Sequence, residues 1–140
     1  MVVPALICGI VFASCTNKVT CDNRTYERLY EGKYTGTFTV KYFIEMPQSW
    51  VGSGNGKAAI EFKDGKFTST GNPNRVPAGG SGNYSIDGNK IIFQDENIWT
   101  ADFDGGLILS GEYDYIFKGK KLKISRKSEH AHYEYNLERK

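Results

Sequence analysis

Several common patterns are missing from this 140-residue chain, and each absence excludes a class of protein. The 18 Lys and Arg and 16 Asp and Glu residues give a net charge of +2 without a basic stripe, which argues against nucleic-acid binding. Three cysteines are too few for a disulfide framework. No apolar run reaches the roughly 20 residues that a membrane-spanning helix needs. The length, with 39% apolar residues, fits one compact domain.

The first residues have the character of an export signal. Residues 2–13 carry no charge and form an apolar stretch of signal-peptide length. The sequence Phe12-Ala13-Ser14-Cys15 follows and resembles the bacterial lipobox, in which small residues precede a cysteine that is lipidated and becomes the new N-terminus. The resemblance implies a signal peptide over 1–14, an anchor at Cys15, and a place in the bacterial cell envelope. An ordinary secretory signal that is cut elsewhere is the alternative.

Residues 15–31 are predicted to be a lipid-anchored tether with a short helix. The segment is polar and contains Tyr26, Leu29 and Tyr30 at the i, i+3, i+4 spacing of one or two helical turns. It lacks the acidic run associated with surface export, which favours the periplasmic face of the membrane. If Cys15 is not lipidated, a small disulfide loop from Cys15 to Cys21 is possible in an oxidising compartment.

From residue 32 to 140 the helical period disappears, and the pattern predicts an all-β domain. Short runs rich in Val, Ile, Thr, Tyr and Phe alternate with clusters of Gly, Asn and Asp, as strands alternate with turns. The strands are expected at 33–45, 57–63, 66–70, 82–87, 90–94, 98–103, 107–117, 121–127 and 132–138.

Alternation within the strands predicts an antiparallel up-and-down meander of eight to nine strands, closed into a small barrel. In the run 107–117, for example, Tyr113 and Tyr115 share one face while Glu112 and Asp114 share the other. The chain offers no amphipathic helix long enough to cover such an apolar face. Closing the sheet on itself buries that face and removes the edges.

The lengths of the connections predict that the two ends of the barrel differ. Tight turns at Asp64-Gly65, Asp87-Gly88 and Asp104-Gly105-Gly106 would all lie at one end, because connections in a meander alternate between ends. The longer segments 46–56 and 71–81 would then form an open mouth at the other end. Trp50 lies in the first of them, where it is suited to close a pocket or to anchor a protein partner.

Three segments of the mature chain resemble the lipocalin-like (calycin-like) lipoproteins of Bacteroidetes. They are the opening Gly32-Lys33-Tyr34-Thr35-Gly36 strand, the hairpin over 84–93 and the closing strand over 133–137. The resemblance implies a barrel of eight or nine strands in the envelope. True lipocalins cap the closed end with a Trp beneath an Arg. Here Tyr34 stands in place of the Trp, and either Arg126 or Arg139 has the parity to cover it.

These features predict a non-catalytic binding module for a small apolar or amphipathic ligand, with no cofactor. The alternative is a protein-interaction or inhibitor module that uses the mouth loops around Trp50. Inward aromatic residues either fill the core or line a pocket. His130 and His132 have a spacing that can bind a metal but lack a third ligand, and Glu112 and Asp114 lie on the wet face of their strand. The candidate ligand-binding residues are Tyr42, Trp50, Phe62, Phe93, Tyr113 and Tyr115.

Overall fold

The computed structural model of the protein describes residues 18–21, 24–27, 29–45 and 48–140. The chain divides into two compact units, Met1–Tyr30 and Glu31–Lys140. The predicted signal peptide and Cys15 lie outside the described residues.

The first unit contains a two-stranded antiparallel sheet. Strand β1 (Lys18–Cys21) pairs with β2 (Arg24–Glu27), with Val19 opposite Tyr26. The prediction of a short helix is therefore wrong for residues 24–27. One or two isolated helical turns cannot repay the cost of helix nucleation, and Thr and Tyr favour extended backbone.

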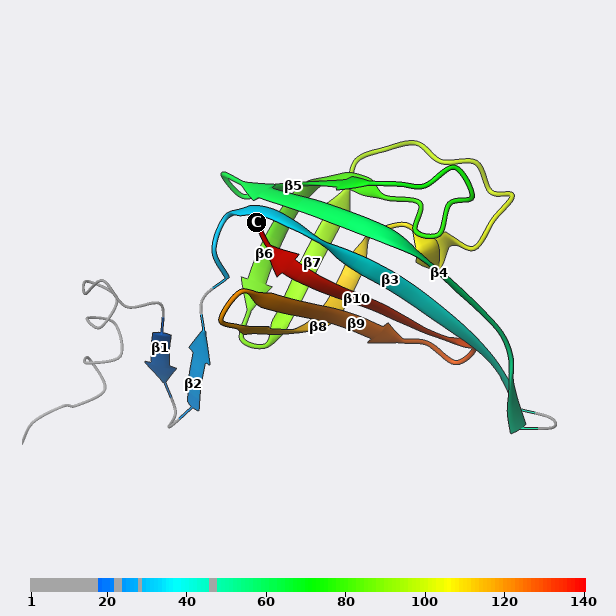
Figure 1. Cartoon of the computed structure of the whole chain (residues 1–140), viewed down its shortest axis with the longest axis horizontal. Helices are drawn as coiled ribbons and strands as arrows, with labels where there is room; N and C mark the ends of the chain where they lie inside the picture. The colour runs from blue at the N-terminus through cyan, green and yellow to red at the C-terminus, as the bar shows by residue number, and fades with distance from the viewer. Residues whose placement is uncertain (1–17, 22–23, 28, 46–47) are drawn as a thin grey trace, which may run out of the picture. The chain divides into compact units, whose positions relative to one another are not determined.

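Eight strands of the second unit form a closed antiparallel barrel, which confirms the predicted all-β meander. Each strand pairs with the next one along the chain, and the last strand pairs with the first of the eight (Figure 1). The strands are β3 (Gly32–Glu45), β4 (Gln48–Lys63), β5 (Lys66–Thr70), β6 (Gly80–Asp87), β7 (Lys90–Asp95), β8 (Gly111–Lys118), β9 (Lys121–Lys127) and β10 (Ala131–Arg139).

The segment predicted as a strand over 98–103 belongs instead to a long connection, 96–110, between β7 and β8. Ile98 is 100% exposed, and the rings of Trp99 and Phe103 pack edge to face with centroids 6.1 Å apart. Trp99 and Phe103 thus pack within the loop rather than in a sheet, and Ile98 is left exposed to solvent. A 3₁₀ turn, η3 (Gly105–Leu107), follows, so the strand predicted over 107–117 begins only at Gly111.

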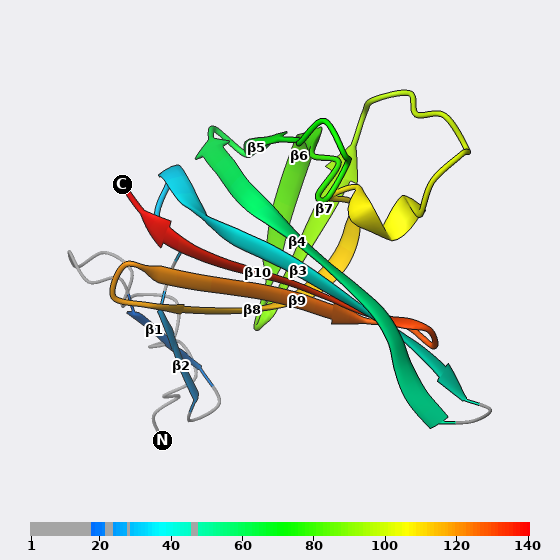
Figure 2. The ribbon, with the colours of Figure 1, turned by 45° about the vertical axis from the view of Figure 1, so that its right-hand side comes forward.

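The loop predicted over 46–56 is also wrong, because β4 already begins at Gln48. Together β3 and β4 form a hairpin that extends past the other strands of the barrel (Figure 2). Strand β10 accompanies β3 only as far as Tyr42, and β5 accompanies β4 only from Ala59. We call the projecting residues 43–45 and 48–51 the arm. A β-bulge between Tyr42 and Phe43 marks its base, where bulges commonly bend a strand.

Gly54 and Gly56, which belong to the segment expected to be a loop, serve close packing instead. The connection 71–79 between β5 and β6 lies against β4. A Cβ atom on Gly56 would stand 2.0 Å from the carbonyl oxygen of Val76, so any larger residue would displace the backbone there. The Asn72 side chain ties the same connection to β4 by donating to the carbonyl of Lys57 at 2.9 Å.

The two ends of the barrel differ, as predicted, but the turns and connections found at each end are not all the predicted ones. Short turns at 64–65, 88–89 and 119–120 define what we call the turn end. The tip of the arm and the connections 71–79, 96–110 and 128–130 define the loop end. The Asp64-Gly65 and Gly88 turns lie together as expected. Asp104-Gly105-Gly106, predicted for that same end, lies at the loop end, because the absence of a strand over 98–103 reverses the order of the later connections.

Side-chain alternation places aromatic rings inside the barrel. In β8, Tyr113, Tyr115 and Phe117 are buried, while the residues between them are exposed. The rings touch one another across the interior: Phe67 lies 4.8 Å from Phe93, and Phe93 lies 5.7 Å from Tyr113. Edge-to-face pairs of this kind each add about 0.5–1.5 kcal/mol to the stabilisation that burial provides.

The packed rings leave the centre of the barrel dry. Phe38 and Tyr135 are 0% exposed, and Phe62, Phe93 and Tyr113 are each 1% exposed. A void wide enough for water would expose the side chains that line it. These described residues therefore leave no ligand-sized space between them, and the interior is a filled core. An eight-stranded barrel is just wide enough for its own side chains to fill it.

The hydroxyl of Tyr135 is one of two buried hydroxyls, with that of Ser69, that have no hydrogen-bond partner among the described residues. Tyr135 Oη is buried and has no hydrogen-bond partner among the described residues, and burial raises the pKa of this phenol well above its usual value. An unsatisfied buried polar group costs about 1–3 kcal/mol. We therefore expect Tyr135→Phe to leave the free energy of unfolding unchanged or to raise it by about 1 kcal/mol.

Urea denaturation of the two proteins measures this effect. The matched control is Tyr133→Phe, which removes a hydroxyl that donates to Asp104 at 2.9 Å and should lower the stability. If Tyr135→Phe destabilised the protein as much as Tyr133→Phe does, the hydroxyl of Tyr135 would have a partner and the expectation would fail.

Candidate functional site

Asp104 is the centre of a polar cluster at the loop end. Its Oδ2 accepts hydrogen bonds from Tyr42 Oη of β3 and Tyr133 Oη of β10, both at 2.9 Å, and its Oδ1 accepts from the backbone N–H of Gly106 at 2.8 Å. As the N-cap of η3, Asp104 also starts the turn that follows it. One carboxylate thus latches the connection 96–110 to the two strands whose pairing closes the barrel.

Arg126 of β9 completes this cluster. Its guanidinium lies 4.5 Å from the centroid of the Tyr113 ring and 5.3 Å from that of Tyr133. Nη1 donates to the carbonyl of Ser110 at 2.8 Å, and Nη2 donates to that of Gly106 at 3.4 Å. The arginine therefore holds the second half of the same connection while it covers two core rings. The sequence suggested Asp104 only as a turn residue, and nothing in its spacing indicated these partners.

The tyrosines of the cluster keep their protons at neutral pH. Burial, followed by the hydrogen bond to Asp104, raises the pKa of Tyr42 to about 12. The same two causes, in the same order, raise the pKa of Tyr133 still further, while Arg126 partly opposes the rise. Both phenols are therefore hydrogen-bond donors to a carboxylate, an arrangement that stabilises the loop.

Backbone hydrogen bonds join the connections 71–79 and 96–110 above the core. The backbone N–H of Ala78 donates to the carbonyl of Leu107 at 2.9 Å, and that of Leu109 donates to the carbonyl of Gly79 at 2.9 Å. Leu107 is 6% exposed and Leu109 0%, so both side chains are buried beneath this cover. The mouth predicted from the loop lengths is thereby filled by the loops themselves.

A shallow groove lies at the base of the arm. It has a volume of about 210 Å³, and the arm contributes Phe43 and Trp50, whose rings pack edge to face at 5.3 Å. Trp50 is 58% exposed and Val51 55%, although both lie in a paired strand. The other residues that line the groove are Lys127, Ser128, Glu129, Ala131 and His132.

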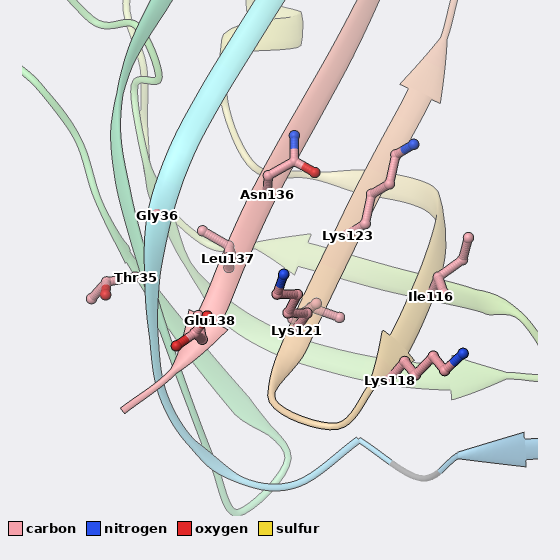
Figure 3. Close-up of a pocket in the computed structure, with 10 residues that line it drawn as sticks. Thr35, Gly36, Ile116, Lys118, Lys121, Lys123, Asn136, Leu137 and Glu138 are labelled. Carbon is pink, nitrogen blue, oxygen red and sulfur yellow. The ribbon is translucent and has the colours of Figure 1, made fainter.

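A larger groove of about 430 Å³ runs along the outer surface of β3, β10, β9 and β8 near the turn end (Figure 3). Its apolar residues include Ile116, Leu122 and Leu137. Its charged residues are Lys118, Lys121, Lys123 and Glu138. The groove is outside the barrel, on the face that the alternation assigned to solvent.

The predicted ligand-binding residues do not lie together in one site. Trp50 is in the arm, and Tyr42 is half-buried with its hydroxyl on Asp104. The other four, Phe62, Phe93, Tyr113 and Tyr115, are buried in the core. These positions do not test whether the residues bind a ligand. Among the six, only Trp50 has an exposed side chain.

The predicted structural cap is divided between the two ends of the barrel. Arg139 is opposite Tyr34 in the β10–β3 ladder, and its Nη2 donates to the carbonyl of Glu31 at 3.0 Å. Arg126 is opposite Tyr133, and Tyr133 is opposite Val40, six residues along β3 from Tyr34. The suggestion that Arg126 covers Tyr34 is therefore wrong, because six residues of strand separate them by roughly 20 Å.

The polar pairs considered for catalysis or metal binding have surface positions. Asp114 Oδ1 accepts a hydrogen bond from Lys90 Nζ at 2.5 Å, and Glu112 lies 4.0 Å from the same nitrogen. His132 pairs with Glu134 at 3.9 Å, while His130 is exposed. Within the described part of the chain, no group of three His, Cys, Asp or Glu side chains has a metal-binding arrangement.

The fold defines a class, an eight-stranded antiparallel meander barrel, which is consistent with the lipocalin-like fold that the sequence implied. No family model matches the chain, and no curated protein or solved structure is significantly similar to it. Over the described residues, no helix has the length and apolar character needed to cross a membrane.

The Asp104 latch predicts a loss of stability at high pH. The pKa of Tyr42 is raised in the folded state, so its contribution is complete below pH 10, the usual value, and disappears as the pH rises to about 12. Over this range the unfolded chain has already released the proton that the folded chain still holds. Thermal unfolding followed between pH 9 and 12 should give a melting temperature that falls less steeply in Tyr42→Phe than in the unaltered protein. Equal slopes would contradict the latch.

Proposed function

We propose that this chain is a lipid-anchored lipoprotein of the bacterial cell envelope, held at the periplasmic face through Cys15, and that its barrel is a non-catalytic binding module. The anchor is supported by the resemblance of residues 12–15 to a lipobox. The single structural observation that carries the binding role is the arm, because it holds an aromatic residue in the open on a paired strand.

The binding surface in this proposal is the arm rather than the barrel interior. Pockets that enclose small ligands have volumes of roughly 300–1,000 Å³ and bury most of the ligand. The arm groove, at about 210 Å³, is smaller and open, and it accommodates one or two side chains of a partner. The core is already occupied by packed rings. These magnitudes favour the protein-interaction role over a ligand held inside the barrel.

The composition of the arm also fits a protein contact. Trp and Tyr are enriched among the residues that dominate binding energy, especially where a pocket adjoins them. Trp50, Val51 and Ile44 are 58%, 55% and 38% exposed. The polar rim of the groove is formed by Lys127, Glu129 and His132. A small apolar or amphipathic ligand that covers Trp50 is the second candidate, and it would use the same groove.

The anchor is tested by Cys15→Ser. We expect the unaltered protein to fractionate with membranes and to incorporate labelled fatty acid, and the variant to do neither, because the thiol is the acceptor of the lipid. Cys21→Ser is the matched control and should remain in the membrane fraction. Equal labelling of the Cys15→Ser protein would contradict lipidation at this position.

The arm is tested by cross-linking. A photoreactive amino acid at Val51 should form a protein adduct in envelope extract, and Trp50→Ala should weaken binding of that partner by at least about 2 kcal/mol, or roughly 30-fold in Kd. Ile98→Ala is the matched control, since Ile98 is 100% exposed but outside the groove. Adducts of equal yield in both variants would exclude the arm. The second candidate would be favoured if no adduct formed and an added amphiphile changed the tryptophan fluorescence of the unaltered protein but not that of Trp50→Ala.

A further inference from the structure

The charges of the barrel are distributed unevenly between its two ends. The turn end comprises residues 31–33, 62–67, 86–91, 117–122 and 138–140. These segments contain nine Lys or Arg and four Asp or Glu, a net charge of +5, although the whole chain carries only +2. The connection 96–110 at the loop end contains Glu96, Asp102 and Asp104 and no basic residue. The barrel is therefore basic at the turn end and acidic at the loop end.

The basic charge is concentrated around an exposed apolar residue. Ile116 is 64% exposed on the outer face of β8. Lys123 is directly opposite it on β9, and Lys118 is opposite Lys121 two residues nearer the turn. Figure 3 shows these four side chains on the outside of the β8–β9 hairpin, along the groove of about 430 Å³. An apolar side chain surrounded by ammonium groups is suited to a surface that has both negative charge and an apolar interior.

Few of these ammonium groups form ion pairs with the described residues of the barrel. Lys123 Nζ lies 3.5 Å from Glu134, and Glu138 is opposite Lys121 in the β10–β9 ladder. Lys118, Lys120 and Lys121 are exposed at the turn, and no ion pair of theirs is found among the described residues. Their charge is therefore available to an external anionic partner.

The chain also enters the barrel at this end. Gly32 is opposite Phe62, beside the turn at 64–65. The carbonyl of Glu31 accepts from Arg139, and its side chain accepts from the backbone N–H of Asp64 at 2.9 Å. Whatever precedes residue 31 is thus joined to the basic end of the barrel and not to the acidic end.

We propose that the turn end is a docking surface for anionic phospholipid headgroups, with Lys118, Lys121 and Lys123 facing the headgroups and Ile116 entering the boundary below them. The inference rests on the proposed membrane anchoring, because the anchored segment is continuous with the chain that enters the barrel at this end. It adds an orientation: the turn end faces the membrane, and the arm and the loop end face away from it. Each basic residue near an anionic membrane strengthens binding about fivefold.

Vesicle co-sedimentation tests the proposal on the full chain made without lipid through Cys15→Ser. The probe is vesicles of phosphatidylglycerol and phosphatidylcholine in equal parts, compared with phosphatidylcholine alone. We expect binding to the mixed vesicles only, and weaker binding as salt is added, because screening shortens the range of charge–charge attraction. Because the protein carries no acyl chain, a failure of this assay is distinguishable from a failure of lipidation at Cys15.

Matched variants distinguish binding through the turn end from binding that depends only on the net charge of the protein. Lys118→Gln with Lys121→Gln should weaken binding about 25-fold, the combined effect of two basic residues at about fivefold each. Lys41→Gln with Lys57→Gln makes the same change in net charge on exposed residues away from the turn end and should have little effect. Ile116→Ser should weaken binding without altering its dependence on salt. The same loss in both lysine pairs, or equal binding to phosphatidylcholine alone, would overturn the proposal.

Discussion

From Ala131 opposite Tyr42 to Arg139 opposite Tyr34, the β10–β3 ladder joins the last strand of the chain to the first strand of the barrel. This pairing hides an apolar face that no other layer covers. With it in place, Phe38 and Tyr135 meet at 4.7 Å, and rings from opposite walls pack together. The Asp104 latch depends on it as well, since Tyr42 and Tyr133 belong to these two strands. The packing of the core, the closure of the barrel and the position of the connection 96–110 therefore all depend on the β10–β3 pairing.

Much of this arrangement could be predicted from local patterns. The alternation of Tyr113, Tyr115 and Phe117 with polar residues gave the inner and outer faces of β8, because a strand has a period of two. The turns at Asp64-Gly65 and Gly88 were predictable because Asp and Gly tolerate the positive φ that tight hairpin turns require. In the structure Asp64, Gly65 and Gly88 all have positive φ. Such features depend on neighbours in sequence, and so sequence reasoning finds them.

The errors have a common physical cause, which is that tertiary packing overrides local chemistry. The glycine-rich segment around Gly56 has the composition of a loop, yet it lies in β4, where the backbone at Val76 packs directly against Gly56. The apolar residues Trp99 and Phe103 have the composition of a strand, yet they pack against each other in a loop. Asp104 and Arg126 were missed as partners of the loop end because their contacts come from strands distant in sequence.

The filled interior shifts attention to the outer surface of the barrel. Lipocalin-like barrels suggest a ligand inside, but here the ring stack from Phe67 through Phe93 to Tyr113 occupies the centre. The polar groups that could orient a ligand at the mouth, Tyr42, Tyr133 and Arg126, are engaged with the connection 96–110. Among the exposed apolar residues of the barrel, Trp50 lies in the arm, at the loop end, and Ile116 lies on β8 close to the turn end.

The length of β3 gives this separation a physical scale. The strand runs without interruption from Gly32, where the preceding chain joins the barrel, to the arm, and Phe43 holds Trp50 at its far end. Eleven steps of about 3.3 Å place the two ends roughly 35 Å apart along the strand. As far as Tyr42, β3 is paired on both sides, with β10 and with β4, so nearly all of this length lies within the closed sheet. In an anchored chain, β3 would act as a strut that sets the height above the bilayer at which a partner is met.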